Sequence, residues 1–219
     1  MSEGPIMSDE RESSSNGPVA PSLRPAGSLR ELGRGAVLVL TVSAAQEMRE
    51  LGRRLATALT AGDLVILSGG LGAGKTTLTQ GIGDGLGVRG PITSPTFVIA
   101  RVHPPLARPA RTGEPGPALV HADAYRLGST LELDDLDLDT DTAASVTVVE
   151  WGEGLAEGLA ADRLEITITP AATEADSSVA GEGDPDDPPG DAARTVRISA
   201  VGERWEGIQL PLASLANRL

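Results

Sequence analysis

The feature that most constrains this chain is a glycine-rich loop at residues 69–76, between an apolar run and a helical stripe. The loop reads Gly-Gly-Leu-Gly-Ala-Gly-Lys-Thr and fits the pattern G-x-x-x-x-G-K-[ST] at every position. The run before it, Leu64–Ser68, is typical of a buried parallel strand. After it, Leu78, Ile82 and Leu86 recur every four residues on one helical face. A strand, a turn and a helix in this order predict a phosphate-binding loop.

Lys75 is the only lysine in the chain, which otherwise uses arginine for its cations. An ammonium is a compact point charge that fits inside a loop against β- and γ-phosphate oxygens, whereas a guanidinium is a wide planar fork. We expect the backbone N–H groups of Gly72 to Thr76 to point at the phosphates, at the N-terminus of the following helix. The hydroxyl of Thr76 would then bind Mg²⁺.

The composition favours one folded α/β domain with tails. The chain has 219 residues, of which 40% are hydrophobic and only 2% aromatic, so we expect a core of Val, Leu, Ile and Ala. The absence of cysteine excludes disulfides, thiolate zinc sites and cysteine nucleophiles, and it is compatible with a cytoplasmic protein. Two histidines cannot make a three-histidine metal site. No apolar run approaches the length that spans a bilayer, so we expect no membrane attachment.

The net charge of −13 is concentrated in two stretches. Residues 131–142 and 174–191 hold 13 of the 31 acids and no base, so the rest of the chain is neutral. No basic face typical of a protein that grips nucleic acid by itself is evident. Any contact with RNA is therefore expected to run through partners.

Composition and periodicity divide the chain into three parts. Residues 1–35 are rich in Ser, Gly, Pro and Glu and are predicted to be a disordered extension. Residues 36–201 form the predicted domain, with a Pro-rich insertion at 104–117 and an acidic, disordered linker at 170–193. Residues 202–219 are a tail that the pattern does not place. A capping-box spacing at Ser43–Gln46 precedes a helical stripe of Met48, Leu51, Leu55 and Leu59.

The apolar runs predict a P-loop NTPase-like α/β fold. We expect a mostly parallel sheet flanked by helices, ending in an antiparallel hairpin. The predicted strands are Ala36–Val42, Leu64–Ser68, Phe97–Val102, Ala118–Ala122, Val146–Val149, Arg163–Thr169 and Thr195–Val201, of which the last two form the hairpin.

Two strands run directly into an acid, as a magnesium site beside a phosphate loop requires. Ala118–Ala122 ends at Asp123, and Val146–Val149 ends at Glu150. In a parallel sheet both tips lie at the edge where open α/β sheets bind ligands. We expect Asp123 and Glu150 to hold Mg²⁺, directly or through water, and to orient the attacking water. The sequence leaves open which acid does which.

Several neighbouring residues have two interpretations each. Thr93–Thr96, with hydroxyls on Ser94 and Thr96, is either a loop that senses the γ-phosphate or a plain turn. Trp151 either contacts the nucleotide or packs the domain edge. Tyr125 and Arg126 either orient Asp123 or serve a partner surface. His121 lies in mid-strand, and we interpret it as a packed core histidine.

Four segments together resemble the TsaE family, small P-loop ATPases of bacterial tRNA threonylcarbamoyladenosine biosynthesis. Their order and spacing match that family, and the resemblance covers roughly residues 36–201. The segments are Gly-Leu-Gly-Ala-Gly-Lys-Thr-Thr (70–77), Ser-Pro-Thr-Phe (94–97), His-Ala-Asp-Ala-Tyr-Arg-Leu (121–127) and Val-Glu-Trp (149–151).

The resemblance implies an accessory ATPase. Such proteins bind ATP and Mg²⁺ and hydrolyse ATP slowly, and they support TsaB and TsaD, which transfer a threonylcarbamoyl group to adenosine 37 of tRNA. By position, Lys75, Asp123 and Glu150 would be catalytic, and Thr76, Asp123 and Glu150 would bind the metal. Arg194 matches a basic position that reaches the nucleotide. The nucleotide contacts implied are Gly72, Ala73, Gly74, Lys75, Thr76, Thr77, Ser94, Thr96, Trp151 and Arg194.

The chain departs from the family in a few places and leaves two other functions open. The family commonly has Asp at the position of Gly70. The N-terminal extension, the Pro-rich insertion and the acidic linker are additions to the compact form that is usual in the family. A small P-loop kinase of a nucleotide or small molecule would need an acceptor site and an Arg-bearing lid, for which Arg108 and Arg111 are the candidates. A non-catalytic scaffold would need only ATP binding.

Overall fold

The structure is a computed structural model that describes residues 1, 30–31, 33–95, 99–106, 116–126, 143–171 and 192–212. Most of the predicted N-terminal extension, the middle of the Pro-rich insertion and most of the acidic linker lie outside these residues. The disorder predicted for the extension and the linker, and the loop predicted for the Pro-rich insertion, therefore stay predictions at these positions. Thr96, Phe97 and the lid candidates Arg108 and Arg111 also lie outside the described residues.

A seven-stranded sheet forms the centre of the described chain, in the order β2-β8-β7-β3-β6-β5-β4. Strands β7, β3, β6 and β5 pair in parallel, β4 is antiparallel to β5, and β8 is antiparallel to both β7 and β2. The predicted parallel centre and terminal hairpin are confirmed. The bounds are β2 Val37–Val42, β3 Leu64–Ser68, β4 Ala100–His103, β5 Ala118–Asp123, β6 Ser145–Glu150, β7 Arg163–Pro170 and β8 Arg194–Val201.

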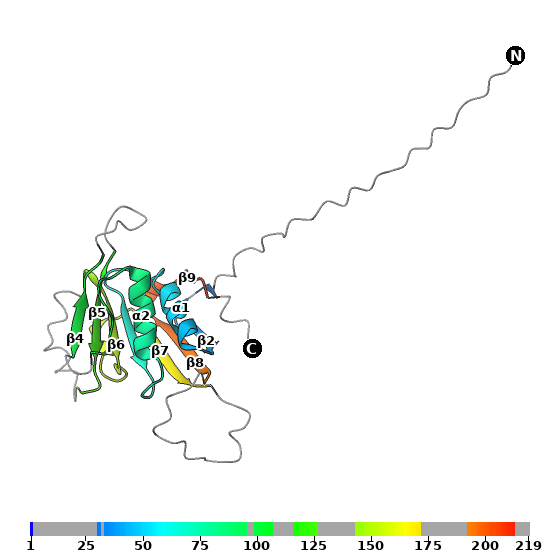
Figure 1. Ribbon diagram of the computed structural model, residues 1–219. Coiled ribbons are helices and arrows are strands. Elements are labelled where there is room, and N and C mark those ends of the chain that lie inside the picture. Colours follow the sequence, from blue (N-terminus) through cyan, green and yellow to red (C-terminus); the bar gives the residue numbers. More distant parts are fainter. Residues whose placement is uncertain are drawn as a thin grey trace, which may run out of the picture.

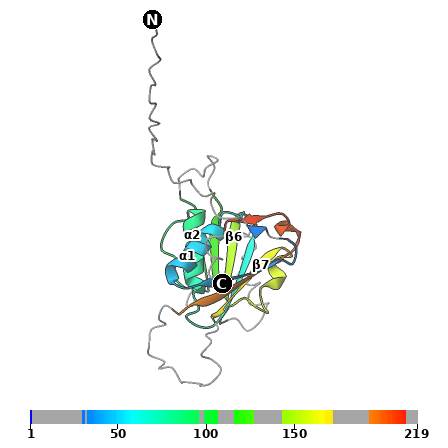
Figure 2. The ribbon, with the colours of Figure 1, turned by 90° about the vertical axis from the view of Figure 1, so that its right-hand side faces the viewer.

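Two helices, α1 (Ala45–Leu55) and α2 (Lys75–Leu86), lie side by side against one face of this sheet (Figures 1 and 2). Glycines allow their close approach. A Cβ at Gly81 would lie 2.1 Å from the carbonyl oxygen of Arg49, and one at Gly52 would lie 2.3 Å from that of Leu78. The opposite face is covered by the segment that follows β6, which includes a short 3₁₀ helix, η1 (Glu157–Leu159).

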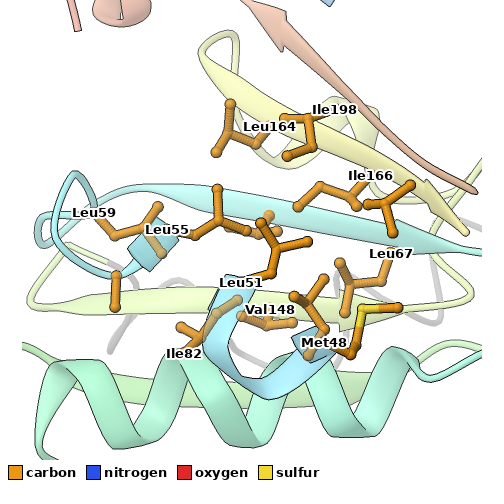
Figure 3. Packing of buried hydrophobic residues seen from close by; sticks show 14 of the residues in the cluster. Met48, Leu51, Leu55, Leu59, Leu67, Ile82, Val148, Leu164, Ile166 and Ile198 are labelled. Atoms are coloured by element: carbon orange, nitrogen blue, oxygen red, sulfur yellow. The ribbon is translucent and has the colours of Figure 1, made fainter. Parts of the chain in front are cut away.

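The core lies mainly between the helices and the sheet. Met48, Leu51 and Leu55 of α1 point toward Leu67 and Val148 on the sheet (Figure 3). The predicted stripe is therefore confirmed as a buried face, although Leu59 is buried beyond the end of α1. β3 is buried at all five positions because its side chains alternate between the two covered faces.

The N-terminus of α1 differs from the predicted capping box by one residue. Ala44 is the N-cap, and it makes no side-chain capping bond. The carboxylate of Glu47 instead accepts the backbone N–H of Ser43 at 2.8 Å. The prediction that Gln46 closes the box from Ser43 is therefore wrong, because the helix begins at Ala45 and places Glu47 at the third helical position.

Two short elements extend the folded part beyond residues 36–201. Strand β1 (Arg30–Glu31) pairs with β9 (Gln209–Leu210), so the predicted disorder does not hold at Arg30–Glu31. A 3₁₀ helix, η2 (Glu203–Trp205), begins the predicted tail, and Trp205, Leu210 and Leu212 are buried in the main core. Burial of these apolar side chains orders a segment that shows no local periodicity.

The strand predicted at Phe97–Val102 is shifted toward the C-terminus. β4 begins at Ala100, after Ile99 takes a left-handed backbone conformation with φ +68°. A branched side chain disfavours that conformation, so this position marks a sharp turn rather than extended backbone. Among the residues that the structure describes, no helix is both long and apolar enough to span a membrane.

Candidate nucleotide site

The glycine-rich loop connects the end of β3 to the start of α2, and at Gly69 it has no room for a side chain. Gly69 has φ +141°, and a Cβ there would lie 2.3 Å from the carbonyl oxygen of Ile168 on β7. Gly74, the N-cap of α2, has φ +108°. Both backbone conformations favour glycine. Since the first N–H groups of a helix have no intrahelical acceptors, the loop presents donors at the N-terminus of α2.

Lys75 lies inside this loop and is only 4% exposed. Its Nζ donates to the carbonyl oxygens of Gly69 at 2.8 Å and Gly70 at 2.9 Å. Burial lowers the pKa of the ammonium below its ordinary value, and the charges of Glu150 and Asp123 oppose that shift. The cation is therefore partly desolvated, which strengthens any interaction it makes with an anion.

The hydroxyl of Thr76 contacts the carboxylate of Glu150 at the tip of β6. Thr76 Oγ1 lies 2.8 Å from Oε1 and 3.1 Å from Oε2. Glu150 is 2% exposed, and its strand β6 pairs directly with β3, the strand that leads into the loop. The sheet therefore delivers this carboxylate to the first turn of α2.

Asp123 lies beside Glu150 at the same edge of the sheet. The two acids are register partners at the ends of the parallel strands β5 and β6. Asp123 is buried, and its Oδ1 accepts the backbone N–H of Tyr125 at 2.9 Å. Both strand tips thus lie at one edge of the sheet, as expected for parallel strands, and Glu150 accepts a hydrogen bond from the hydroxyl of Thr76.

Trp151 packs over the lysine of the loop. Lys75 Nζ lies 3.5 Å from the centroid of the Trp151 ring, a cation–π contact. The Tyr125 ring is 5.1 Å from that of Trp151, at an angle of 53°. Trp151 has φ +60°, a strained conformation for an aromatic residue that turns the chain sharply after β6. Of its two predicted interpretations, the geometry favours a place in the site over packing at the domain edge.

A hollow of about 210 Å³ lies beside the loop. Arg194, at the start of β8, lines it together with the loop residues. The apolar residues at the end of β2 and the start of α1 form the rest of its wall, a contribution that the sequence pattern did not reveal. The lining residues are Val42, Ala44, Ala45, Met48, Gly72, Ala73, Gly74, Thr77, Ala192 and Arg194.

The predicted hydroxyl loop is only partly described. Ser94 is exposed, and Thr96 lies outside the described residues. The carbonyl of Pro95 accepts the N–H of Ile99, and the carbonyl of Ile99 accepts the N–H of Asp123, both at 2.8 Å. The loop is therefore tied to the acidic edge of the sheet through its backbone.

His121 has a contact that the sequence interpretation missed. It is fully buried on β5, as predicted for a core histidine, but its Nε2 lies 2.8 Å from Oε1 of Glu150. The alternation of side chains along a strand could have indicated this contact, since His121 precedes Asp123 by two positions and therefore lies on the same face of the sheet. The identity of the neighbouring strand, however, decides whether that face meets Glu150.

The donor set fits a magnesium–nucleotide complex. Two carboxylates and one hydroxyl supply oxygen, which Mg²⁺ prefers, and Mg²⁺ usually completes its shell with phosphates and water. Within the described residues no cluster of three or more His, Cys, Asp or Glu could hold a metal by itself. A site that needs phosphate oxygens to complete it is consistent with the adjacent lysine and helix N-terminus.

Comparison with known protein families identifies the group to which this chain is related. Residues 42–178 match the family described as "Threonylcarbamoyl adenosine biosynthesis protein TsaE". The chain belongs to the TsaE family. The predicted resemblance is therefore confirmed, and the matched region includes the phosphate loop, both acids and Trp151.

Two bacterial TsaE proteins illustrate the similarity. The chain is 57% identical over 159 residues to "tRNA threonylcarbamoyladenosine biosynthesis protein TsaE" of Streptomyces coelicolor, which covers 72% of this chain and 93% of that one. It is 33% identical over 162 residues to the protein of the same name from Bacillus subtilis, covering 74% and 84%.

A solved structure supports the fold. The crystal structure of Bacillus subtilis YdiB aligns with 78% of this chain and 90% of its own, at 27% identity and a TM-score of 0.53.

Proposed function

We propose that this TsaE family member binds ATP with Mg²⁺ and hydrolyses it slowly, as an accessory protein for threonylcarbamoyl transfer to adenosine 37 of tRNA. In this proposal it acts in the cytoplasm with TsaB and TsaD, which carry out the transfer. The observation that carries the proposal is the arrangement of Lys75 and Thr76. A buried ammonium is followed by a hydroxyl that donates to the buried carboxylate of Glu150.

Nucleotide binding is assigned to the loop and the adjoining hollow. Lys75 Nζ can exchange its bonds to two loop carbonyls for bonds to phosphate oxygens, and the backbone donors of Gly72–Thr77 are at hand. Arg194 lines the hollow beside the loop, which supports its implied contact with the nucleotide. Ser94 and Thr96 remain proposed as phosphate-sensing hydroxyls.

Metal binding is assigned to Thr76, Asp123 and Glu150. Mg²⁺ would supply positive charge against the phosphate oxygens, while these three side chains hold it directly or through water. Because the hydroxyl of Thr76 donates a hydrogen bond to Glu150, the lone pairs of the hydroxyl oxygen are free for a cation. The carboxylate thereby orients the hydroxyl.

Hydrolysis would rest on charge placement and on water orientation. Lys75 carries a positive charge where phosphate charge would develop, in a site with little exposure to water. Asp123 and Glu150 are carboxylates able to accept a hydrogen bond from an attacking water. The chain has no cysteine to act as a nucleophile.

Phosphate release from ATP by the purified chain, alone and with a cognate TsaB–TsaD pair, tests the proposal. Lys75→Ala is the blank, and Lys75→Arg keeps the charge but not the shape. We expect slow turnover that changes when the pair is added, and loss of binding or turnover in both variants. Turnover by Lys75→Ala at the wild-type rate would remove the assignment of the site.

Two other outcomes would redirect the assignment. Turnover indifferent to the TsaB–TsaD pair would favour a small P-loop kinase, and screening of acceptors would follow. Normal complementation by a variant that binds ATP without hydrolysing it would favour a scaffold. The net charge of −13 supports indirect contact with tRNA, since a polyanion would be repelled by this chain.

A further inference from the structure

The side chain of His121 is placed where it can control the orientation of Glu150. It is 0% exposed, lies in the middle of β5, and its Nε2 is 2.8 Å from Glu150 Oε1. The ionised carboxylate has no proton to give, so a hydrogen bond between them requires the proton to lie on Nε2. Nδ1 has no hydrogen-bond partner among the described residues. Among the described residues, the contact with Glu150 is therefore the hydrogen bond that the imidazole ring makes.

Glu150 depends on a small number of partners. Its Oε1 accepts from both His121 and Thr76, at 2.8 Å each, whereas Oε2 accepts from Thr76 at 3.1 Å. The Glu150 side chain is 3% exposed, so water replaces a lost hydrogen bond poorly. Without His121, the hydroxyl of Thr76 would be the remaining side chain that the structure shows bonded to this carboxylate, and the carboxylate could rotate.

We propose that His121 is a positioning residue. It holds the Glu150 carboxylate so that this group accepts a hydrogen bond from the Thr76 hydroxyl, whose oxygen stays available to Mg²⁺. This inference rests on the proposed function, and it deepens the assignment of the metal site. The chain of contacts runs from β5 to β6 and then to the first turn of α2, so it exists only where the sheet pairs these elements. Groups that orient a ligand in this way typically change metal affinity or activity by about 10–100-fold.

His103 provides a matched control for the loss of a buried histidine. It lies on β4, the strand paired with β5, and is 3% exposed. Its Nδ1 is 3.3 Å from the carbonyl oxygen of Arg89, and it shows no hydrogen bond to Glu150 among the contacts of the described residues. His103 and His121 are thus both buried, on neighbouring strands of the sheet, but the contact with Glu150 belongs to His121.

The test measures ATP binding by calorimetry, with Mg²⁺ and with EDTA, together with kcat, KM and thermal unfolding of the full chain. His121→Leu removes the donor, and His121→Gln keeps an N–H at the end of the side chain. We expect His121→Leu to bind ATP in EDTA as the wild type does and to lose about tenfold or more of the gain in affinity that Mg²⁺ gives. Its kcat should fall further than KM rises, and His121→Gln should restore most of both.

The control variants separate positioning from structural support. His103→Leu should lower thermal stability without changing the response to Mg²⁺. In a Glu150→Gln background, adding His121→Leu should cause little further loss, because the two residues act through one contact. If His121→Leu does not fold, His121→Gln and the shorter His121→Asn decide the matter. Gln should retain the Mg²⁺ response and Asn should lose it.

Each contrary result has its own meaning. Wild-type binding that gains from Mg²⁺, with the same gain in His121→Leu or in His121→Asn, would overturn the role of His121 and leave the proposed function intact. Equal losses of the Mg²⁺ response in His121→Leu and His103→Leu would also overturn it. No ATP binding by the wild type would overturn the proposed function and this inference together.

Discussion

The hydroxyl of Thr76 donates to the carboxylate of Glu150, 74 positions further along the chain, at 2.8 Å from Oε1. This contact joins the first turn of α2 to the tip of β6 and brings together the two parts of the candidate metal site. It also explains how a threonine next to Lys75 can be oriented before any cation arrives.

Replacing Thr76 by Val should weaken the response of ATP binding to Mg²⁺. Valine keeps the shape of the threonine side chain but removes the hydroxyl that donates to Glu150. We therefore expect the gain in ATP affinity that Mg²⁺ gives to fall about tenfold or more. Calorimetry with Mg²⁺ and with EDTA measures it. Thr79→Val is the control, because the Thr79 hydroxyl bonds only to the helix carbonyl of Lys75 among the contacts described. A wild-type Mg²⁺ response in Thr76→Val would contradict the assignment.

Chemical acylation should modify Lys75 at a lower pH than it modifies an ordinary lysine. Burial lowers the pKa of this ammonium below the usual 10.5, and only the neutral amine reacts. Between the two pKa values the unfolded chain binds more protons, so the free energy of unfolding should rise with pH there. Labelling with acetic anhydride across a pH series, read by mass spectrometry, checks the midpoint, and ATP with Mg²⁺ should protect the site. A midpoint at or above 10.5 would count against the buried cation.

ATP should change the tryptophan emission of this chain through Trp151. Lys75 Nζ lies 3.5 Å from the centre of that ring, and transfer of the ammonium to phosphate would remove the cation from it. The only other tryptophan, Trp205, is fully buried in the core. A fluorescence titration of Trp151→Phe should show no response, whereas Trp205→Phe should keep it. A response that persists in Trp151→Phe would assign the change elsewhere.

Replacing Gly81 by Ala should destabilise the fold despite the higher helix propensity of alanine. A Cβ at Gly81 would lie 2.1 Å from the backbone carbonyl oxygen of Arg49, so α1 and α2 would have to separate. Alanine gains roughly 1 kcal/mol over glycine from helix propensity. We expect the clash to outweigh this gain, so that the free energy of unfolding falls by about 2 kcal/mol or more in total. Urea unfolding measures it. Gly158→Ala is the control, because a Cβ there meets nothing within 4 Å, and equal stability of the two variants would refute the tight packing.

The sequence by itself determined the local elements that carry the phosphate loop. Strand β3 was predicted with the bounds that the structure has, and the stripe of Leu78 and Ile82 placed α2 directly behind the loop. These signals are local, because the alternation of a strand, the 3.6-residue period of a helix and the backbone freedom of glycine act between near neighbours in the chain. The ends of β5 and β6 at Asp123 and Glu150 followed from the same kind of pattern.

Only the tertiary structure decided which of these local pieces meet. The contact of His121 with Glu150 and the wall that Met48 adds to the hollow depend on β5 pairing with β6 and on α1 packing beside the loop. Likewise, Arg30–Glu31 forms a strand because Gln209–Leu210 lies beside it, although neither segment has a period of its own. Such contacts are selected by burial of apolar surface over the whole sheet, and this free energy is not contained in any short stretch of sequence.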